Sequence, residues 1–216
     1  FDAGDLKSLD PHRAAATADR AIVDMMFNAL VRYPPGNQVK VEPDLAESWT
    51  VSADKRTWTF KLRKGVFFHP FPGSPNGYEL TSEDVVFSLK RAANKDTSAY
   101  AGDYGGISVE AVDPATVKMA IDKPISDPLF LAKFANYAGG FIVSKKAIES
   151  KGEDWFKTNP VGTGPFKFES YEPRQKVAFA ANPKYFRGAP VLKKVTARFM
   201  PDVIKRIHQF SRGIPR

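Results

Sequence analysis

The chain has 216 residues and a mass of 23.9 kDa, enough for one sizeable domain or two small ones. Hydrophobic residues make up 43% and charged residues 26%, a balance typical of a globular protein rather than a disordered or collagen-like chain. The sequence contains no cysteine, which excludes disulfides, zinc–thiolate sites, iron–sulfur clusters and cysteine nucleophiles. No apolar run approaches the roughly 18 residues that a membrane span requires.

The net charge of +8 is confined to the C-terminal end of the sequence. Residues 1–183 contain 23 basic and 23 acidic residues, whereas residues 184–216 contain nine basic residues against Asp202 alone. A basic segment can contact nucleic acid or anionic lipid, but it is more often a solvated face or a surface that pairs with a missing part. We therefore expect no nucleic-acid partner.

The sequence starts at Phe1 rather than at Met, and no basic-then-apolar leader precedes the first predicted elements. This suits an exported chain whose signal peptide has been removed, or an excised fragment.

Hydrophobic periodicity and turn residues predict an α+β chain with a large mixed or antiparallel sheet system. In chain order we expect a helix over 17–31 capped by Thr17, strands over 48–51 and 57–62, a loop over 69–80, a helix from Thr81 with a buried stripe of Val85, Val86, Leu89 and Ala92, a loop over 95–106, a hairpin of 107–112 and 116–121, a helix over 128–134, a strand over 140–143, a helix over 144–150, and strands over 165–171, 176–181 and 191–199.

No catalytic or metal centre is visible in the residues. His12, His69 and His208 lie far apart and lack spaced metal-ligating partners, so ordinary hydrogen-bonded histidines are the better interpretation. No nucleophile elbow is present. Gly162 and Gly164 form no phosphate loop, because a third glycine is missing and Pro165 removes an amide donor. We predict no enzyme activity, no cofactor and no metal.

Two further patterns have ordinary structural explanations. The adjacent acids Glu83 and Asp84 follow Thr81-Ser82 and suit the first turn of a helix. The many aromatic residues could stack on single-stranded nucleic acid, but their alternation with Thr and Lys favours a sheet with one buried face.

The order of several motifs carries more information than any one of them. These are Leu9-Asp10-Pro11-His12, Leu45-Ala46-Glu47-Ser48-Trp49, Trp58-Thr59-Phe60-Lys61-Leu62-Arg63-Lys64-Gly65-Val66, Thr81-Ser82-Glu83-Asp84-Val85-Val86-Phe87, and Val161-Gly162-Thr163-Gly164-Pro165-Phe166. Together they closely resemble the peptide/nickel class of periplasmic solute-binding proteins that serve ABC importers, family 5 of the extracytoplasmic solute-binding proteins. The resemblance runs to about Asp202, beyond which the acidic step expected after Gly213 is absent.

The resemblance implies a periplasmic-binding-protein-like first lobe with mixed or antiparallel sheets and flanking helices, and with the second lobe missing. It also implies a division of the chain: residues 1–40 as the first part of lobe I, 41–158 as an inserted subdomain, 159–202 as the return to lobe I, and 203–216 as an aberrant or truncated basic tail. Relatives are usually more than twice as long.

In this family an extended ligand is held partly by strand-like main-chain hydrogen bonds. The resemblance therefore implies ligand-binding residues in four places: Ala14, Ala15, Ala16 and Thr17; Tyr100; Tyr104; and Gly162 with Thr163. Each has a structural alternative. The small residues also suit a helix lead-in, the tyrosines also suit loop packing, and the glycine segment also suits the chain path near the lobe junction.

The resemblance implies a non-catalytic receptor, in the periplasm as a monomer, that captures a peptide or other small solute and delivers it to an ABC permease in the inner membrane. The alternative is a truncated lobe that acts as an interaction module for a protein or polyanion, through its exposed cleft face and the basic tail. Steep salt dependence of binding would favour that alternative.

Overall fold

The computed structural model describes residues 5–36, 39–135 and 137–200. The predicted basic tail over 203–216 and His208 lie outside the described residues. The helices are α1 (Thr17–Val23), α2 (Ser82–Ala92), α3 (Ala101–Tyr104), α4 (Asp127–Ala132), α5 (Lys145–Lys151) and α6 (Glu153–Phe156), with a 3-10 turn at Ala138–Gly140. The strands are β1 (Val31–Arg32), β2 (Glu42–Pro43), β3 (Ala46–Val51), β4 (Thr57–Leu62), β5 (Ile107–Asp113), β6 (Thr116–Ile121), β7 (Phe166–Glu172), β8 (Lys176–Ala181) and β9 (Lys194–Arg198).

The largest sheet has four antiparallel strands in the order β3-β4-β6-β5. Alternation in β4 buries Trp58, Phe60 and Leu62, as the sequence predicts. Trp58 stacks on Phe130 of α4 with ring centroids 3.8 Å apart, and α2 packs against β5 and β6. One face of the sheet therefore forms a core with these helices.

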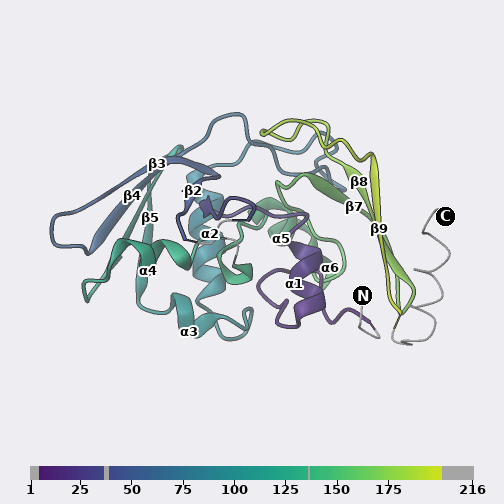
Figure 1. Cartoon of the computed structure of the whole chain (residues 1–216), viewed down its shortest axis with the longest axis horizontal. Helices are drawn as coiled ribbons and strands as arrows, with labels where there is room; N and C mark the ends of the chain where they lie inside the picture. Colours follow the sequence, from purple (N-terminus) through teal and green to yellow (C-terminus); the bar gives the residue numbers. More distant parts are fainter. Residues whose placement is uncertain (1–4, 37–38, 136, 201–216) are drawn as a thin grey trace.

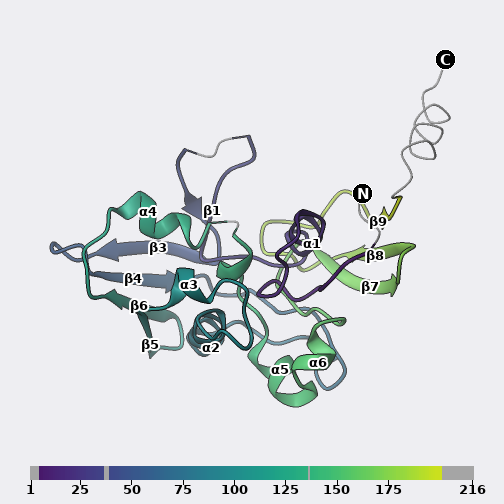
Figure 2. The ribbon, with the colours of Figure 1, turned by 90° about the horizontal axis from the view of Figure 1, so that it is seen from below.

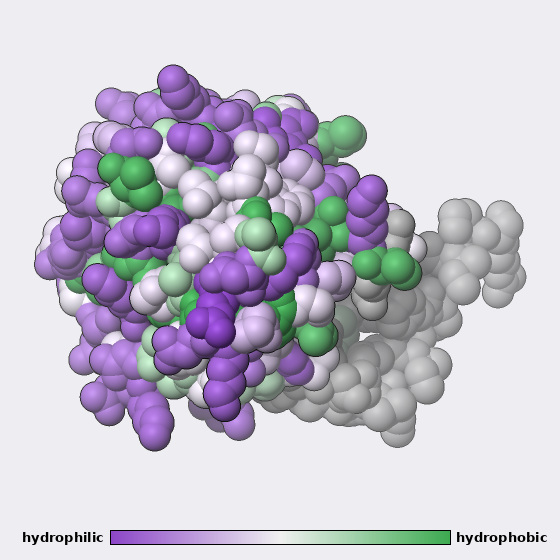
Figure 3. All heavy atoms as spheres, turned by 90° about the vertical axis from the view of Figure 1, so that its left-hand side faces the viewer, coloured by the Kyte–Doolittle hydropathy of each residue, from purple (hydrophilic) through white to green (hydrophobic). Residues whose placement is uncertain are grey.

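A second, three-stranded antiparallel sheet, β7-β8-β9, lies at the opposite end of the molecule, and α1, α5 and α6 lie between the two sheets (Figures 1 and 2). The view toward the β3–β4 hairpin is mainly hydrophilic, with separate apolar patches rather than one continuous one (Figure 3). The predicted α+β class, with antiparallel sheets and flanking helices, is confirmed.

Helix α2 begins where the sequence predicts. The N–H of Asp84 donates to the Thr81 side chain, and the N–H of Thr81 donates to the Asp84 carboxylate. These two bonds form a reciprocal capping box. The predicted buried stripe is only partly correct, because Val86 is half-buried, whereas Ser88 and Arg91 are buried. The polar side chains face inward because each has a bonding partner there, as described below for Arg91.

The predicted helix over 17–31 is wrong beyond Val23. The apolar residues of this stretch are buried as expected, but the carbonyls of Met25 and Met26 accept hydrogen bonds from the N–H groups of Phe166 and Gly164. These tertiary bonds replace helical ones. Thr17 is also not the N-cap, since Ala16 occupies that position without a side-chain bond.

The strand predicted over 140–143 is wrong as well. This segment follows the 3-10 turn and is held by single bonds: the Ile142 N–H donates to the Asn28 carbonyl and the Val143 N–H to the Ser88 hydroxyl. The predicted loop over 95–106 contains the short helix α3, and α6 was not predicted. The other predicted helices and strands are confirmed to within a few residues at their ends.

A buried cluster of charged groups joins three distant segments. The Arg91 guanidinium of α2 donates to both carboxylate oxygens of Asp10, at 3.1 and 2.5 Å, and pairs with Glu153 of α6 at 2.5 Å. It also donates to Nδ1 of His12 at 2.8 Å, so the Nε2–H of His12 donates to the Phe141 carbonyl at 3.0 Å. Asp10 and His12 are fully buried. The cluster therefore fixes the N-terminal segment against α2 and α6.

We predict that Arg91→Met destabilises the chain by about 3 kcal/mol or more, because it leaves the buried Asp10 carboxylate with only the more distant Arg13 guanidinium, at 3.7 Å, as an ionic partner. Urea unfolding measures the difference, with Lys90→Met, at the exposed neighbouring position of α2, as the matched control. The double variant Arg91→Met/Asp10→Asn should recover part of the loss. Equal stabilities of Arg91→Met and the control would contradict this role.

Candidate functional site

The segment that leads into α1 presents main-chain groups to solvent. Ala15 and Thr17 are exposed, Ala16 is half-buried, and the backbone of Ala16 is extended, with φ -74° and ψ 149°. Within the described residues, neither the Ala15 carbonyl nor the Thr17 N–H has a hydrogen-bond partner. In an extended chain these two groups lie on the same side and flank the residue between them. They can hold one residue of a second extended chain by two hydrogen bonds.

Tyr100 holds this segment in place through the buried Ala14. Its hydroxyl donates to the carbonyl of the buried Ala14 at 2.5 Å, and its ring meets Tyr137 edge to face with centroids 5.0 Å apart. Tyr137 is half-buried and its hydroxyl donates to Asp103 at 3.1 Å. Of the predicted site residues, the structure therefore brings Ala14–Thr17 and Tyr100 together, and it adds Tyr137, which the sequence analysis missed.

Tyr104 and Gly139 support the tyrosine pair from inside. Tyr104 is buried and its hydroxyl donates to the Lys133 carbonyl at 2.6 Å. A Cβ at Gly139 would lie 2.6 Å from the Tyr104 ring and 2.7 Å from Cβ of Tyr100, so only glycine fits there. The doublet Gly139-Gly140 was the available signal for this close approach.

Gly162 and Gly164 pack directly on the main chain of Met26. A Cβ would lie 2.0 Å from the Met26 carbonyl oxygen at Gly162 and 2.5 Å from the Met26 carbonyl carbon at Gly164. Two bonds from His69 hold the loop: its N–H donates to the Gly162 carbonyl at 2.8 Å and its Nε2 to the Gly164 carbonyl at 2.9 Å. The loop is therefore a rigid connection between distant segments.

Thr163 belongs to a buried polar chain. Its hydroxyl donates to the Asn28 side-chain oxygen at 3.1 Å, and the Asn28 amide donates to Asp44 at 2.9 Å. Arg187 donates from Nε to the other Asp44 oxygen at 3.1 Å. Burial raises the pKa of Asp44, while the bonds from Asn28 and Arg187 oppose that rise. Both Gly162 and Thr163 are buried, away from the exposed segment at Ala15–Thr17.

A row of residues on α1 connects the exposed segment to a hollow. The Arg20 N–H donates to the Ala16 carbonyl at 3.0 Å and the Asp24 N–H to the Arg20 carbonyl at 3.1 Å, so these three residues lie one turn apart on one side of the helix. Arg20 and Asp24 are exposed, whereas Ile22 and Val23, which lie between them in the sequence, are buried.

The hollow, of about 600 Å³, lies at the C-terminal end of α1, beside β1 and the segment that follows it. We call it the α1 hollow. Its lining includes charged, amide and aromatic side chains, among them Asp24, Asn28, Asp44, Phe141 and Tyr185. Phe141 also accepts the His12 bond, which connects the hollow to the segment before Ala14.

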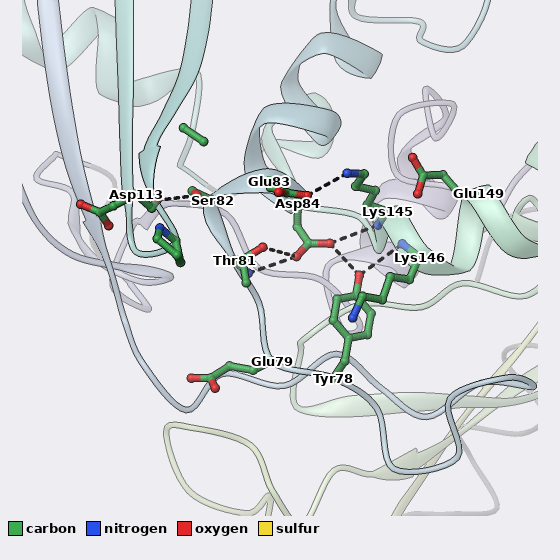
Figure 4. Close-up of a pocket in the computed structure, with 12 residues that line it drawn as sticks. Tyr78, Glu79, Thr81, Ser82, Glu83, Asp84, Asp113, Lys145, Lys146 and Glu149 are labelled. Carbon is green, nitrogen blue, oxygen red and sulfur yellow. Dashed lines mark hydrogen bonds and ion pairs between the residues drawn. The ribbon is translucent and has the colours of Figure 1, made fainter.

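A second hollow, of about 520 Å³, lies between α2, α5 and the β5–β6 turn (Figure 4). Its central polar groups bond to one another: the Tyr78 hydroxyl donates to Asp84 at 2.6 Å, and Lys145 pairs with Glu83 at 2.9 Å. Lys146 lies over the Tyr78 ring, 4.3 Å from its centroid. These contacts fasten the start of α2 to α5, and we do not place the ligand site there.

The two histidines in the described part of the chain have structural roles. His12 and His69 are buried and hydrogen-bonded, as described above, and burial lowers the pKa of each to about 4. The described residues contain no group of three or more His, Asp or Glu side chains placed to hold a metal ion. Within the same residues, no helix is long and apolar enough to cross a membrane.

We predict that Gly162→Ala destabilises the chain by about 2 kcal/mol or more, because the new methyl group would overlap a main-chain oxygen that cannot move independently. Thermal or urea unfolding gives the difference. Gly102→Ala is the matched control, since a Cβ there meets nothing within 4 Å. Equal unfolding midpoints of the two variants would show that the close packing of Gly162 on Met26 does not contribute to the stability of the fold.

A second prediction concerns the stability of the fold at acidic pH. Burial lowers the folded-state pKa of His69 from 6.5 to about 4, and the charge of Lys167 adds to this effect. The stability that depends on neutral His69 is therefore present above pH 6.5 and is lost as the pH falls toward 4. His69→Gln removes this titration, so between pH 7 and 4.5 the wild type should lose about 2 kcal/mol more than the variant in urea unfolding. Parallel pH profiles would contradict this.

The sequence matches a known protein family and is similar to several known proteins. Residues 40–213 match the sequence family described as bacterial extracellular solute-binding proteins, family 5 Middle. Di/tripeptide-binding protein 2 of Pseudomonas aeruginosa is 30% identical over 87% of this chain and 38% of its own length. Heme-binding protein A of Haemophilus influenzae is 31% identical over 91% of this chain and 38% of its own length.

Solved structures agree in fold. MoaA of Agrobacterium tumefaciens R10, in complex with mannopinic acid, superposes with a TM-score of 0.91 at 44% identity, over 98% of this chain and 42% of its own. DppA of Helicobacter pylori, in complex with the peptide STSA, gives a TM-score of 0.88 at 29% identity, over 97% of this chain and 44% of its own. The chain thus spans about two fifths of the length of the relatives it matches. It belongs to family 5 of the bacterial extracellular solute-binding proteins.

Proposed function

We propose that this chain is the part of a solute receptor that holds an extended ligand along the segment Ala15–Thr17. The main support is that, within the described residues, the Ala15 carbonyl and the Thr17 N–H on either side of Ala16 have no hydrogen-bond partner. They lie next to the ring pair Tyr100–Tyr137. Membership of a solute-binding family supports this, as do relatives whose names include di/tripeptides and a solved relative with a bound peptide.

The ligand class that this geometry favours is a small solute with a peptide-like main chain. One N–H donor and one C=O acceptor of the same ligand residue would match the Ala15 carbonyl and the Thr17 N–H, respectively. The exposed side of α1 and the tyrosine pair would then lie beside the ligand, with Ala14 and Tyr104 holding the pair from the buried side. Gly162 and Thr163 pack instead on Met26 and Asn28, beyond the end of α1.

The wider role follows from the family and is part of the same proposal. The chain acts in the periplasm as a monomer, performs no catalysis, and hands its solute to an ABC permease. Residues 1–40 and 159–202 form one part of the binding lobe, and residues 41–158 form a subdomain inserted between them. In support, β3–β6 all lie within residues 41–158 and β7–β9 within 159–202.

The direct test is isothermal titration calorimetry with a panel of di- and tripeptides and with mannopinic acid. We expect saturable binding of at least one peptide. If none of these solutes binds, and native mass spectrometry of the purified chain detects no co-purified small molecule, the proposal is wrong.

A main-chain variant tests the position of the ligand. Thr17→Pro removes the unbonded N–H, yet proline suits the first position of a helix and the extended Ala16 before it. We predict that Thr17→Pro keeps the unfolding midpoint but weakens binding about tenfold, the effect of one lost hydrogen bond. Thr17→Ala keeps the N–H and is the control. Equal affinity of the two variants would place the ligand elsewhere.

A further inference from the structure

Asp24 lies at the C-terminal cap of α1 and lines the α1 hollow. Its side chain is exposed, and in the described part of the chain its carboxylate has no hydrogen bond and no ion pair. The surrounding protein and the nearby Asp44 carboxylate both raise the pKa of Asp24. The carbonyl end of a helix also disfavours a negative charge. An anion at this position therefore does not help the chain to fold.

The other charged groups of the α1 hollow have partners. Both carboxylate oxygens of Asp44 accept hydrogen bonds, from Asn28 and Arg187. Arg32 pairs with Glu42 at 2.6 Å. Within the described residues, Asp24 is thus the one charged side chain lining this hollow that has no ionic or hydrogen-bonded partner.

Aromatic rings share the lining with Asp24. Phe27 and Phe141 stack with ring centroids 6.3 Å apart, and Tyr33 and Tyr185 also line the hollow. The faces of such rings attract cations. The space, about 600 Å³, is large enough for part of a small solute. An unpaired carboxylate among aromatic rings suits an ammonium group better than an anion or a neutral polar group.

We propose that the α1 hollow is a subsite for a protonated amine of the bound solute, anchored by the Asp24 carboxylate. This rests on the proposed function, because the row Ala16–Arg20–Asp24 leads from the main-chain docking segment to the hollow. The solute class becomes narrower: a molecule with a peptide-like main chain and a cationic amine displaced from it along α1.

The test uses a small probe that does not depend on the identity of the solute. n-Butylammonium chloride is titrated into the chain and followed by proton–nitrogen correlation NMR, with butan-1-ol as the neutral probe of similar shape. We expect saturable shifts of the backbone amides at Asp24 and Asn28 with the ammonium probe but not with the alcohol. Asp24→Asn should weaken the ammonium binding about tenfold or more.

Asp154→Asn, at an exposed carboxylate of α6, is the matched control and should leave the probe affinity unchanged. Asp24→Asn should also raise the unfolding midpoint of the unliganded chain, since it removes a charge that the fold disfavours; a lower midpoint would mean that the carboxylate has a structural role instead. Absence of ammonium shifts near Asp24, or equal shifts in Asp24→Asn, would overturn the proposal. Titrations with a lysine-containing peptide separate the two ideas: equal affinity of the wild type and Asp24→Asn for that peptide refutes the amine subsite and leaves solute capture intact.

Discussion

The buried contact between Arg91 and Asp10 is the constraint on which the arrangement of the site depends. It fixes the segment around Asp10 against α2, and His12 extends the same cluster to the Phe141 carbonyl. The next bonds along the chain are from the Ala99 N–H to the His12 carbonyl and from the Tyr100 hydroxyl to the Ala14 carbonyl. Because removal of Arg91 would leave the buried Asp10 carboxylate with only the more distant Arg13, the cluster strongly favours this one geometry. The position of the exposed main-chain groups of Ala15 and Thr17 therefore depends on this cluster.

Much of the fold follows from local signals. The hairpin β5–β6 and strand β4 show clear alternation of polarity, and α2 begins with a capping box that can be seen in the letters alone. The helix expected over 17–31 fails for a non-local reason. Its apolar spacing is helical, but the carbonyls of Met25 and Met26 are used by a loop far along the chain. No periodicity within the segment contains that information.

The site was foreseen in part, and by resemblance rather than by spacing. The resemblance directed attention to the segment before α1 and to Tyr100, which the structure joins by a hydrogen bond. Tyr137 and Asp24 were missed, because a single tyrosine in a loop or a single aspartate at a helix end has no pattern around it. Their interest comes from what the fold places beside them: an edge-to-face ring beside Tyr137 and the α1 hollow beside Asp24. Gly162 and Thr163 show the converse, since a specific motif there is accounted for by internal packing.

On the side where the Ala15 carbonyl and the Thr17 N–H lie, the segment Ala15–Thr17 offers one carbonyl and one N–H, because the Ala15 N–H already donates to the Arg13 carbonyl. If the ligand docks as proposed, strand pairing on this part of the receptor therefore stops after a single residue of the ligand. Such an edge sets the register of a bound chain but cannot measure how long the chain is. On the same proposal, discrimination by length would have to come from whatever closes the far end of the ligand.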